Sequence, residues 1–128
     1  GTVQPGEKKA YDDALKAFQS GNLKRADEGF AAFVNRYPKS PYVPLALFWS
    51  GNSKYANKDY KAAMTQLQSL IARYPNHPRI PAAMLTLGNC QLEMGNKAAA
   101  KRTFIEIVAQ YPDTDTAKDA QRLIAATK

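Results

Sequence analysis

Apolar positions along the chain recur with the period of an α-helix, in short blocks separated by turn-forming residues. The first block has the i, i+3, i+4, i+7 spacing of one helical face and comprises Tyr11, Ala14, Leu15 and Phe18. After a Gly21-Asn22 turn a second block follows with the same period and comprises Ala26, Phe30, Phe33, Val34 and Tyr37. Two amphipathic helices joined by a short turn predict a helical hairpin.

This hairpin pattern occurs three times. Tyr-Pro pairs stand at Tyr37, Tyr74 and Tyr111, and the residues before each pair keep the same register. Small residues align at Ala14, Gly51 and Gly88, alanines at Ala26, Ala63 and Ala100, and bulky apolar residues at Phe30, Leu67 and Phe104. A hairpin that cannot bury its apolar face alone must stack on its neighbours. The sequence therefore predicts an all-α array of three hairpins that forms a right-handed α-solenoid.

Prolines and turn residues set the boundaries of the array. Pro44 and Pro81 suit the first turn of a helix, whereas each proline of a Tyr-Pro pair disfavours helix at its tyrosine. Thr114 and its two aspartate neighbours offer an N-cap for a last helix that has no partner after it. We expect a linker at residues 1–6 and one repeat domain at residues 7–128, with hairpins at about 7–40, 41–77 and 78–112 and a capping helix at 113–126.

Composition narrows the function classes. Of the 128 residues 45% are hydrophobic, enough for a continuous core, but no apolar run approaches the roughly 20 residues that span a bilayer. We therefore expect no membrane insertion. The formal net charge is +7, and basic residues recur near the starts of the second helices: Lys24, Arg25, Lys58, Lys61, Lys101 and Arg102. This places much of the charge on the outer face, which favours an acidic partner or a solvated surface over nucleic acid.

Residues for catalysis are sparse. His77 is the single histidine and Cys90 the single cysteine, and no ligand cluster, nucleophile motif or phosphate loop accompanies either. We expect no enzyme activity, no metal and no cofactor.

The order of small residue, turn glycine, alanine, bulky residue and proline resembles the tetratricopeptide repeat, although the period is 37 residues instead of the usual 34 and Lys58 replaces one turn glycine. The strings Tyr37-Pro38-Lys39-Ser40, Tyr74-Pro75-Asn76-His77 and Phe48-Trp49-Ser50-Gly51 are similar to the C-terminal repeat domain of the YbgF/CpoB family, the periplasmic coordinators of the Tol-Pal system. Outer-membrane assembly lipoproteins of the same repeat class share the Tyr-Pro-x-Ser element.

The resemblance implies a noncatalytic scaffold of the Gram-negative periplasm. Members bind the protein TolA and coordinate outer-membrane constriction with the peptidoglycan synthase machinery in cell division. They also carry a signal peptide and a trimerising coiled coil, which this sequence lacks, so we expect this fragment to be mainly monomeric and its parent trimeric. A structural subunit of an outer-membrane protein assembly complex is one alternative. A basic repeat that binds nucleic acid is another.

In this repeat class the first helix of each hairpin lines the concave face. A groove for a peptide or a helical segment is thus predicted from Tyr11, Leu15, Phe18, Phe48, Trp49, Asn52, Tyr55, Leu85, Asn89 and Leu92. Asn52 and Asn89 share a register and could hold a peptide backbone or merely cap local turns. Trp49 aligns with polar residues and is expected to be partly exposed. Core packing is the favoured role of Tyr11, Phe48, Tyr55 and Leu85.

Overall fold

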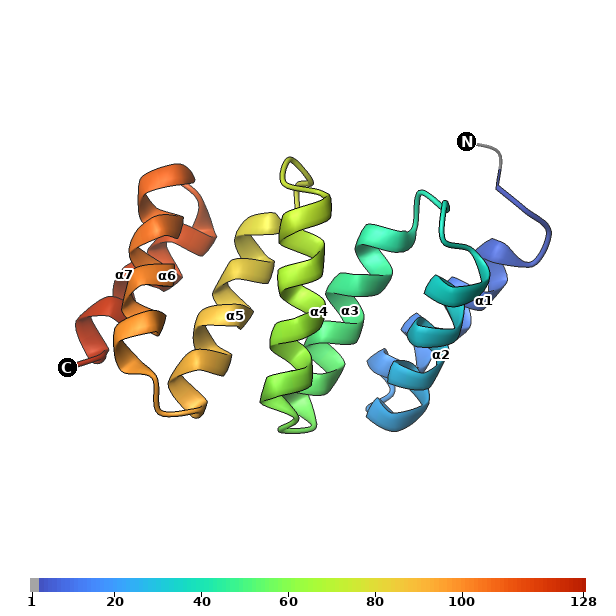
Figure 1. Ribbon diagram of the computed structural model, residues 1–128, viewed down its shortest axis with the longest axis horizontal. Helices are drawn as coiled ribbons and strands as arrows, with labels where there is room; N and C mark the ends of the chain where they lie inside the picture. Colours follow the sequence, from blue (N-terminus) through green and yellow to red (C-terminus); the bar gives the residue numbers. More distant parts are fainter. Residues whose placement is uncertain (1–2) are drawn as a thin grey trace.

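The computed structural model describes residues 3–128, which form seven α-helices and no strand within that range. The helices stand side by side along the long axis of the molecule, with the two termini at opposite ends (Figure 1). Their bounds are α1 Glu7–Gln19, α2 Leu23–Arg36, α3 Val43–Ala56, α4 Tyr60–Arg73, α5 Ile80–Glu93, α6 Lys97–Gln110 and α7 Asp115–Ala126. Three hairpins and one further helix make up the expected solenoid. Residues 1 and 2 of the predicted linker lie outside the described residues.

Helix ends coincide with the residues that the sequence marks as breakers. Each second helix ends one residue before a Tyr-Pro pair, with Tyr37, Tyr74 and Tyr111 as C-caps. Proline occupies the first turn of both α3 and α5, where its missing N–H costs no helical hydrogen bond. Thr114 caps α7, because its hydroxyl accepts a hydrogen bond from the backbone N–H of Ala117 at 3.0 Å. The predicted cap of the last helix is confirmed.

The turn within each hairpin requires a left-handed backbone. Gly21 and Gly95 adopt φ values of 84°, which a residue without a Cβ reaches at little cost. Lys58 stands at the equivalent position of the second hairpin and adopts φ 65°. The turn geometry is therefore kept even where the sequence departs from glycine.

Close approach of the two helices in a hairpin explains the register of small and bulky residues. A Cβ built on Gly51 would come within 2.6 Å of the Leu67 side chain, and one on Gly88 within 2.3 Å of the Phe104 ring. Both glycines are buried, and so are the bulky residues that face them. The fully buried core continues along the array through Ala26, Phe30, Phe33, Ala63, Leu67, Leu70, Ala100, Phe104 and Ile107.

The helices form two layers. First helices contact one another along the array, α1 with α3, α3 with α5, and α5 with α7. The second helices α2, α4 and α6 contact their sequence neighbours but not one another in the described part of the chain. Because the first helices lie closer together, they form the inner, concave side of the curve, as expected. No helix in residues 3–128 is long and apolar enough to cross a membrane.

Candidate partner-binding groove

The ten residues predicted to line the groove all lie on the inner helices α1, α3 and α5. They differ in how far they reach the surface. Tyr11 and Phe48 are buried, each with 6% of its surface exposed. The other eight are half-buried, namely Leu15, Phe18, Trp49, Asn52, Tyr55, Leu85, Asn89 and Leu92. Tyr11 and Phe48 therefore belong to the core, and the other eight remain the predicted surface of the groove.

Tyr11 joins the first two hairpins. Its ring packs against Phe30 and Phe33, each at 6.0 Å between centroids, and stacks on Tyr42 at 4.9 Å. Its hydroxyl accepts a hydrogen bond from the indole N–H of Trp49 at 3.0 Å. Burial raises the pKa of the Tyr11 phenol above its ordinary value, so the neutral hydroxyl is retained throughout the physiological range. Tyr11 thus belongs to the core, which is the role favoured from sequence.

Trp49 is half-buried, and the expectation of partial exposure is confirmed. Its ring lies 5.3 Å from that of Phe18 and 5.0 Å from that of Phe48. Because its N–H is already bonded to Tyr11, the side chain offers a partner apolar surface and no hydrogen bond. Trp49 is at once a groove residue and a link between α1 and α3.

Arg79 is a groove residue that the sequence reading missed. Its guanidinium carbon lies 5.4 Å from the ring centroid of Phe48 and 5.5 Å from that of Trp49, and the residue is exposed. Such stacking holds a cation over an aromatic platform. The repeat register could have revealed it, because Arg79 aligns with Tyr42 and Phe48 aligns with Tyr11. Tyr42 stacks on the Tyr11 ring, and Arg79 covers the Phe48 ring in the same way.

The two asparagines at the same register have different surroundings. The Asn52 side-chain amide donates to the Phe48 carbonyl at 2.9 Å, and its oxygen accepts from the Thr86 hydroxyl at 2.9 Å. Asn52 therefore ties α3 to α5 and has one N–H left. The side chain of Asn89 makes no hydrogen bond within residues 3–128, so both its donor and its acceptor are free for a partner. Asn89 is the better placed of the two for a peptide backbone.

The ends of the groove differ in chemistry. Aromatic rings and Arg79 occupy the end near α1. At the other end of α3, Tyr55 packs against Tyr60 with centroids 5.6 Å apart. Burial raises the pKa of Tyr55, and the nearby carboxylate of Glu93 adds to this shift. The inner surface is therefore aromatic and cationic at one end, amide-lined in the middle and weakly acidic at the other.

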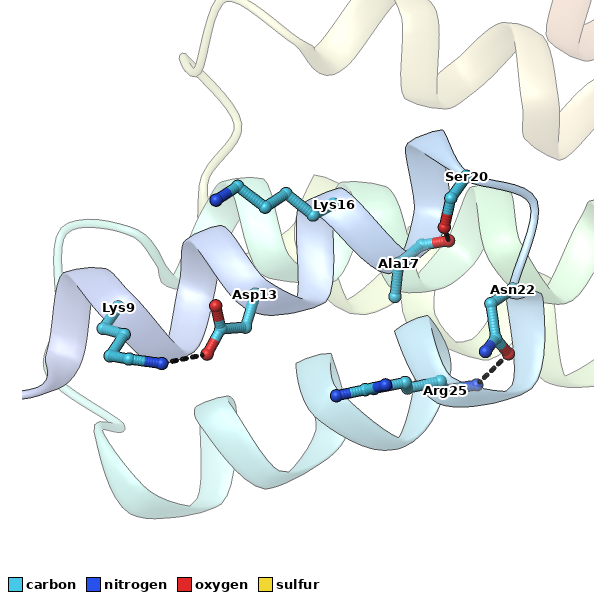
Figure 2. A pocket seen from close by; sticks show the side chains of 7 residues that line it. All are labelled: Lys9, Asp13, Lys16, Ala17, Ser20, Asn22 and Arg25. Carbon is cyan, nitrogen blue, oxygen red and sulfur yellow. Dashed lines mark hydrogen bonds and ion pairs between the residues drawn. The ribbon is translucent and has the colours of Figure 1, made fainter.

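Outside the groove, the basic residues near the starts of the second helices point to solvent. Lys24, Arg25, Lys58, Lys61 and Arg102 are exposed and Lys101 is half-buried. An open hollow at the turn between α1 and α2 is lined by Lys9 and Lys16 of α1 and by Arg25 of α2 (Figure 2).

The two residues considered for catalysis have structural roles. Cys90 is fully buried, and burial raises the pKa of its thiol to about 11, which keeps it protonated and unreactive. The ring of His77 accepts a hydrogen bond from the backbone N–H of Arg79 at 3.1 Å in the connector before α5. Among residues 3–128 no cluster of three or more His, Cys, Asp or Glu could hold a metal ion.

Comparisons with known proteins agree with this geometry. A family model named YfiO, described as outer membrane lipoprotein, matches residues 4–128. The cell division coordinator CpoB of Pseudomonas putida is 35% identical over 63 residues, which are 46% of this chain and 24% of that protein. The match thus spans about a quarter of the length of this curated relative.

Solved structures show the same fold at low identity. The chaperone SycD of Yersinia enterocolitica, in complex with a peptide of the translocator YopD, has a TM-score of 0.78 and 18% identity, with 98% of this chain and 91% of SycD covered. The TPR2B domain of yeast Sti1, in a complex with pHsp70, has a TM-score of 0.79 and 12% identity, with 97% of each chain covered. Both likenesses establish a solenoid of tetratricopeptide repeats.

Proposed function

Because the chain belongs to the YfiO family and is a tetratricopeptide-repeat domain of the CpoB type, we propose that it is a noncatalytic scaffold whose concave groove binds TolA in the periplasm. In this role it coordinates outer-membrane constriction with septal peptidoglycan synthesis during cell division. The observation that carries the proposal is the sequence similarity to a cell division coordinator, which lies on a fold whose inner face is open and partly apolar.

The chemistry of the groove favours a hydrophobic or helical segment over a free carboxylate terminus. Tetratricopeptide repeats that bind the C-terminal tails of chaperones clamp the terminal carboxylate with lysines on their inner helices. In this chain the corresponding positions hold Tyr11, Phe48 and Leu85. Phe18 and Trp49 offer apolar rings at one end of the groove. Large aromatic side chains of this kind are typical anchors of protein interfaces, because they bury much area and lose little entropy.

The amides add a means of fixing the bound segment. Neighbouring helices are separated by about 8 to 10 Å, and an extended chain advances about 3.3 Å per residue. Asn52 and Asn89 would therefore meet peptide groups about three residues apart. Asn89 has its full hydrogen-bonding capacity and Asn52 has one N–H, so we expect Asn89 to contribute more.

Titration of a TolA fragment by calorimetry tests the proposal. The pair Asn52→Ala and Asn89→Ala should weaken binding at least tenfold, since each replacement loses a hydrogen bond worth about 0.5 to 1.5 kcal/mol and leaves a desolvated peptide group of the partner unpaired. Asn35→Ala, an exposed amide on α2, is the matched control and should bind like the wild type. Trp49→Ala should cost about 2 kcal/mol or more of binding free energy.

Trp49→Ala also removes the bond to Tyr11, so its folding must be followed by circular dichroism. Asn89→Ala is free of this complication. Wild-type affinity in Asn89→Ala, Asn52→Ala and Trp49→Ala alike would contradict the groove site and move TolA to the basic outer face.

A second candidate is a structural subunit of an outer-membrane protein assembly complex. It is favoured by the YfiO match, which covers residues 4–128 and hence the whole array. A photo-crosslinking residue in place of Asn89 distinguishes the two in cells. Crosslinks to TolA support the first function, whereas crosslinks to outer-membrane assembly proteins without TolA support the second.

A further inference from the structure

The end face of the array formed by α1 is charged at positions that are apolar or small and uncharged in every later repeat. Lys9, Asp13 and Lys16 are exposed on this face. Their register equivalents in the later repeats are buried or half-buried. Those of Lys9 are Ala46, Ala83 and Ala120, those of Asp13 are Ser50, Leu87 and Ile124, and those of Lys16 are Ser53, Cys90 and Thr127. Another hairpin could not stack here without burying these charges, which is costly. These charges therefore disfavour the stacking of another hairpin on this face.

This surface carries a shallow, open groove. Two adjoining cavities of about 480 and 430 Å³ lie along the seam between α1 and α2 and share Lys9 and Asp13. The floor is shallow because the helices approach closely. A Cβ on Gly29 would lie 2.9 Å from that of Ala14. Ala10 and Ala32 continue the apolar floor toward the start of α1.

Cations dominate the walls of the groove. The lining includes Lys9, Lys16, Arg25 and Arg36 and a single carboxylate, that of Asp13. Lys9 pairs with Asp13 at 2.7 Å, whereas Lys16 and Arg25 form no ion pair with any residue between 3 and 128 (Figure 2). The hydrogen bond from Lys9 holds the pKa of Asp13 below its ordinary value, and the charges of Lys16 and Arg25 add to this shift. Two cations thus lie above an apolar seam without local neutralisation.

The next hairpin shows what kind of element fits such a seam. On α3 the equivalent face is covered by α2, whose Phe30, Ala31 and Val34 lie beside Leu47 and Ser50. We propose that the α1–α2 seam docks an amphipathic helix of a partner protein in the same way. In this helix apolar side chains enter over Ala10 and Gly29 while carboxylates pair with Lys16, Arg25 and Arg36. The charge of the walls selects an acidic helix. This site is separate from the concave groove.

A synthetic peptide of about 14 residues, the length of α2, tests the proposal. It carries leucine at every third or fourth position and glutamate at the others, so that it forms an acidic amphipathic helix. Added to the ¹⁵N-labelled protein, it should shift the amide resonances of α1 and the first turns of α2. The double variant Lys16→Glu with Arg25→Glu should weaken binding by roughly tenfold at low salt. The matched control is Lys101→Glu with Arg102→Glu, which changes the charge equally on α6.

Several outcomes would overturn the proposal. Equal weakening by both double variants would mean that only the net charge of the protein acts. The same affinity for a peptide with lysine in place of glutamate would rule out charge selection. If a single-stranded oligonucleotide shifted the same resonances and bound more tightly than the peptide, the groove would belong to nucleic acid. Shifts confined to α3 and α5 would place the peptide in the concave groove instead.

Discussion

The two junctions between hairpins are built on the same backbone plan with different chemistry. At the first junction, between α2 and α3, the carboxylate of Asp27 pairs with Lys54 at 2.7 Å and accepts a hydrogen bond from Ser50 at 3.1 Å. At the second junction, between α4 and α5, the positions of Asp27 and Lys54 are occupied by Met64 and Gln91. The register of the repeat fixes where side chains meet, but not whether they meet through charge or through apolar contact.

Aromatic content follows the same division. The first junction gathers the rings of Tyr11, Phe30, Phe33 and Tyr42. The second is aliphatic and buries Leu67, Leu70, Ile80, Met84 and Cys90. Aromatic rings and a directional ion pair define one arrangement of neighbouring helices more narrowly than aliphatic side chains do. The orientation of the first hairpin on the second is therefore fixed by specific contacts, while the second and third hairpins are held together mainly by the burial of aliphatic side chains.

Removing an aromatic ring should break the first junction with the largest effect. Tyr11→Ala leaves a cavity beside Phe30 and Phe33 and deprives Trp49 of its acceptor, at a cost of about 3 to 5 kcal/mol of unfolding free energy. Leu85→Ala on α5, a half-buried aliphatic position in the same register two repeats later, should cost roughly 2 kcal/mol. Urea unfolding followed by circular dichroism compares them. Equal losses would contradict the difference between the junctions.

Overpacking a hairpin should have the next largest effect. In Gly88→Ala the new methyl meets the rigid Phe104 ring, whereas in Gly51→Ala it meets the flexible end of Leu67. We expect a loss of about 1 to 3 kcal/mol for Gly88→Ala, reduced by the better helix propensity of alanine, and a smaller loss for Gly51→Ala. Thermal unfolding measures both. Combining Gly88→Ala with Phe104→Leu should cost less than the two separate losses added together.

Converting the first junction to the chemistry of the second should have the smallest effect. Asp27→Met leaves Lys54 half-buried without its partner and should cost about 1 kcal/mol of unfolding free energy. Adding Lys54→Gln should recover most of this, because no unpaired charge remains. The double-mutant cycle for the exposed pair Lys8 and Asp12 is the control, and its coupling should be below about 0.5 kcal/mol. No recovery in the double variant would show that the ion pair itself orients the junction.

Much of the fold was predictable, because the features that set it are local in sequence. The alignment of Gly51 with Gly88, and of Leu67 with Phe104, was sufficient to predict that the two helices of a hairpin lie close together. The prolines and turn residues indicated the helix ends for the same reason, because they act on the chain next to them. At Lys58 the sequence departs from glycine, and the period alone indicated the turn that the backbone adopts.

The site was less predictable, since it depends on which side chains meet between repeats. Register put Asn52 and Asn89 on one face but could not show that Thr86 occupies the oxygen of Asn52. It likewise suggested exposure of Trp49 without its bond to Tyr11. These contacts depend on the side-chain conformations and on the distance between inner helices, neither of which the repeat period encodes.

The chain of contacts from Tyr11 through Trp49 to Arg79 links all three hairpins, because these residues lie on α1 and α3 and at the start of α5. In a simple array each repeat contacts only its neighbours, and a terminal repeat can unfold while the middle repeats stay folded. Here the fraying of α1 would release Trp49 and weaken the platform that holds Arg79. Local opening at one end is thereby coupled to the far hairpin, so a ligand seated on Trp49 would slow amide hydrogen exchange along the whole inner layer.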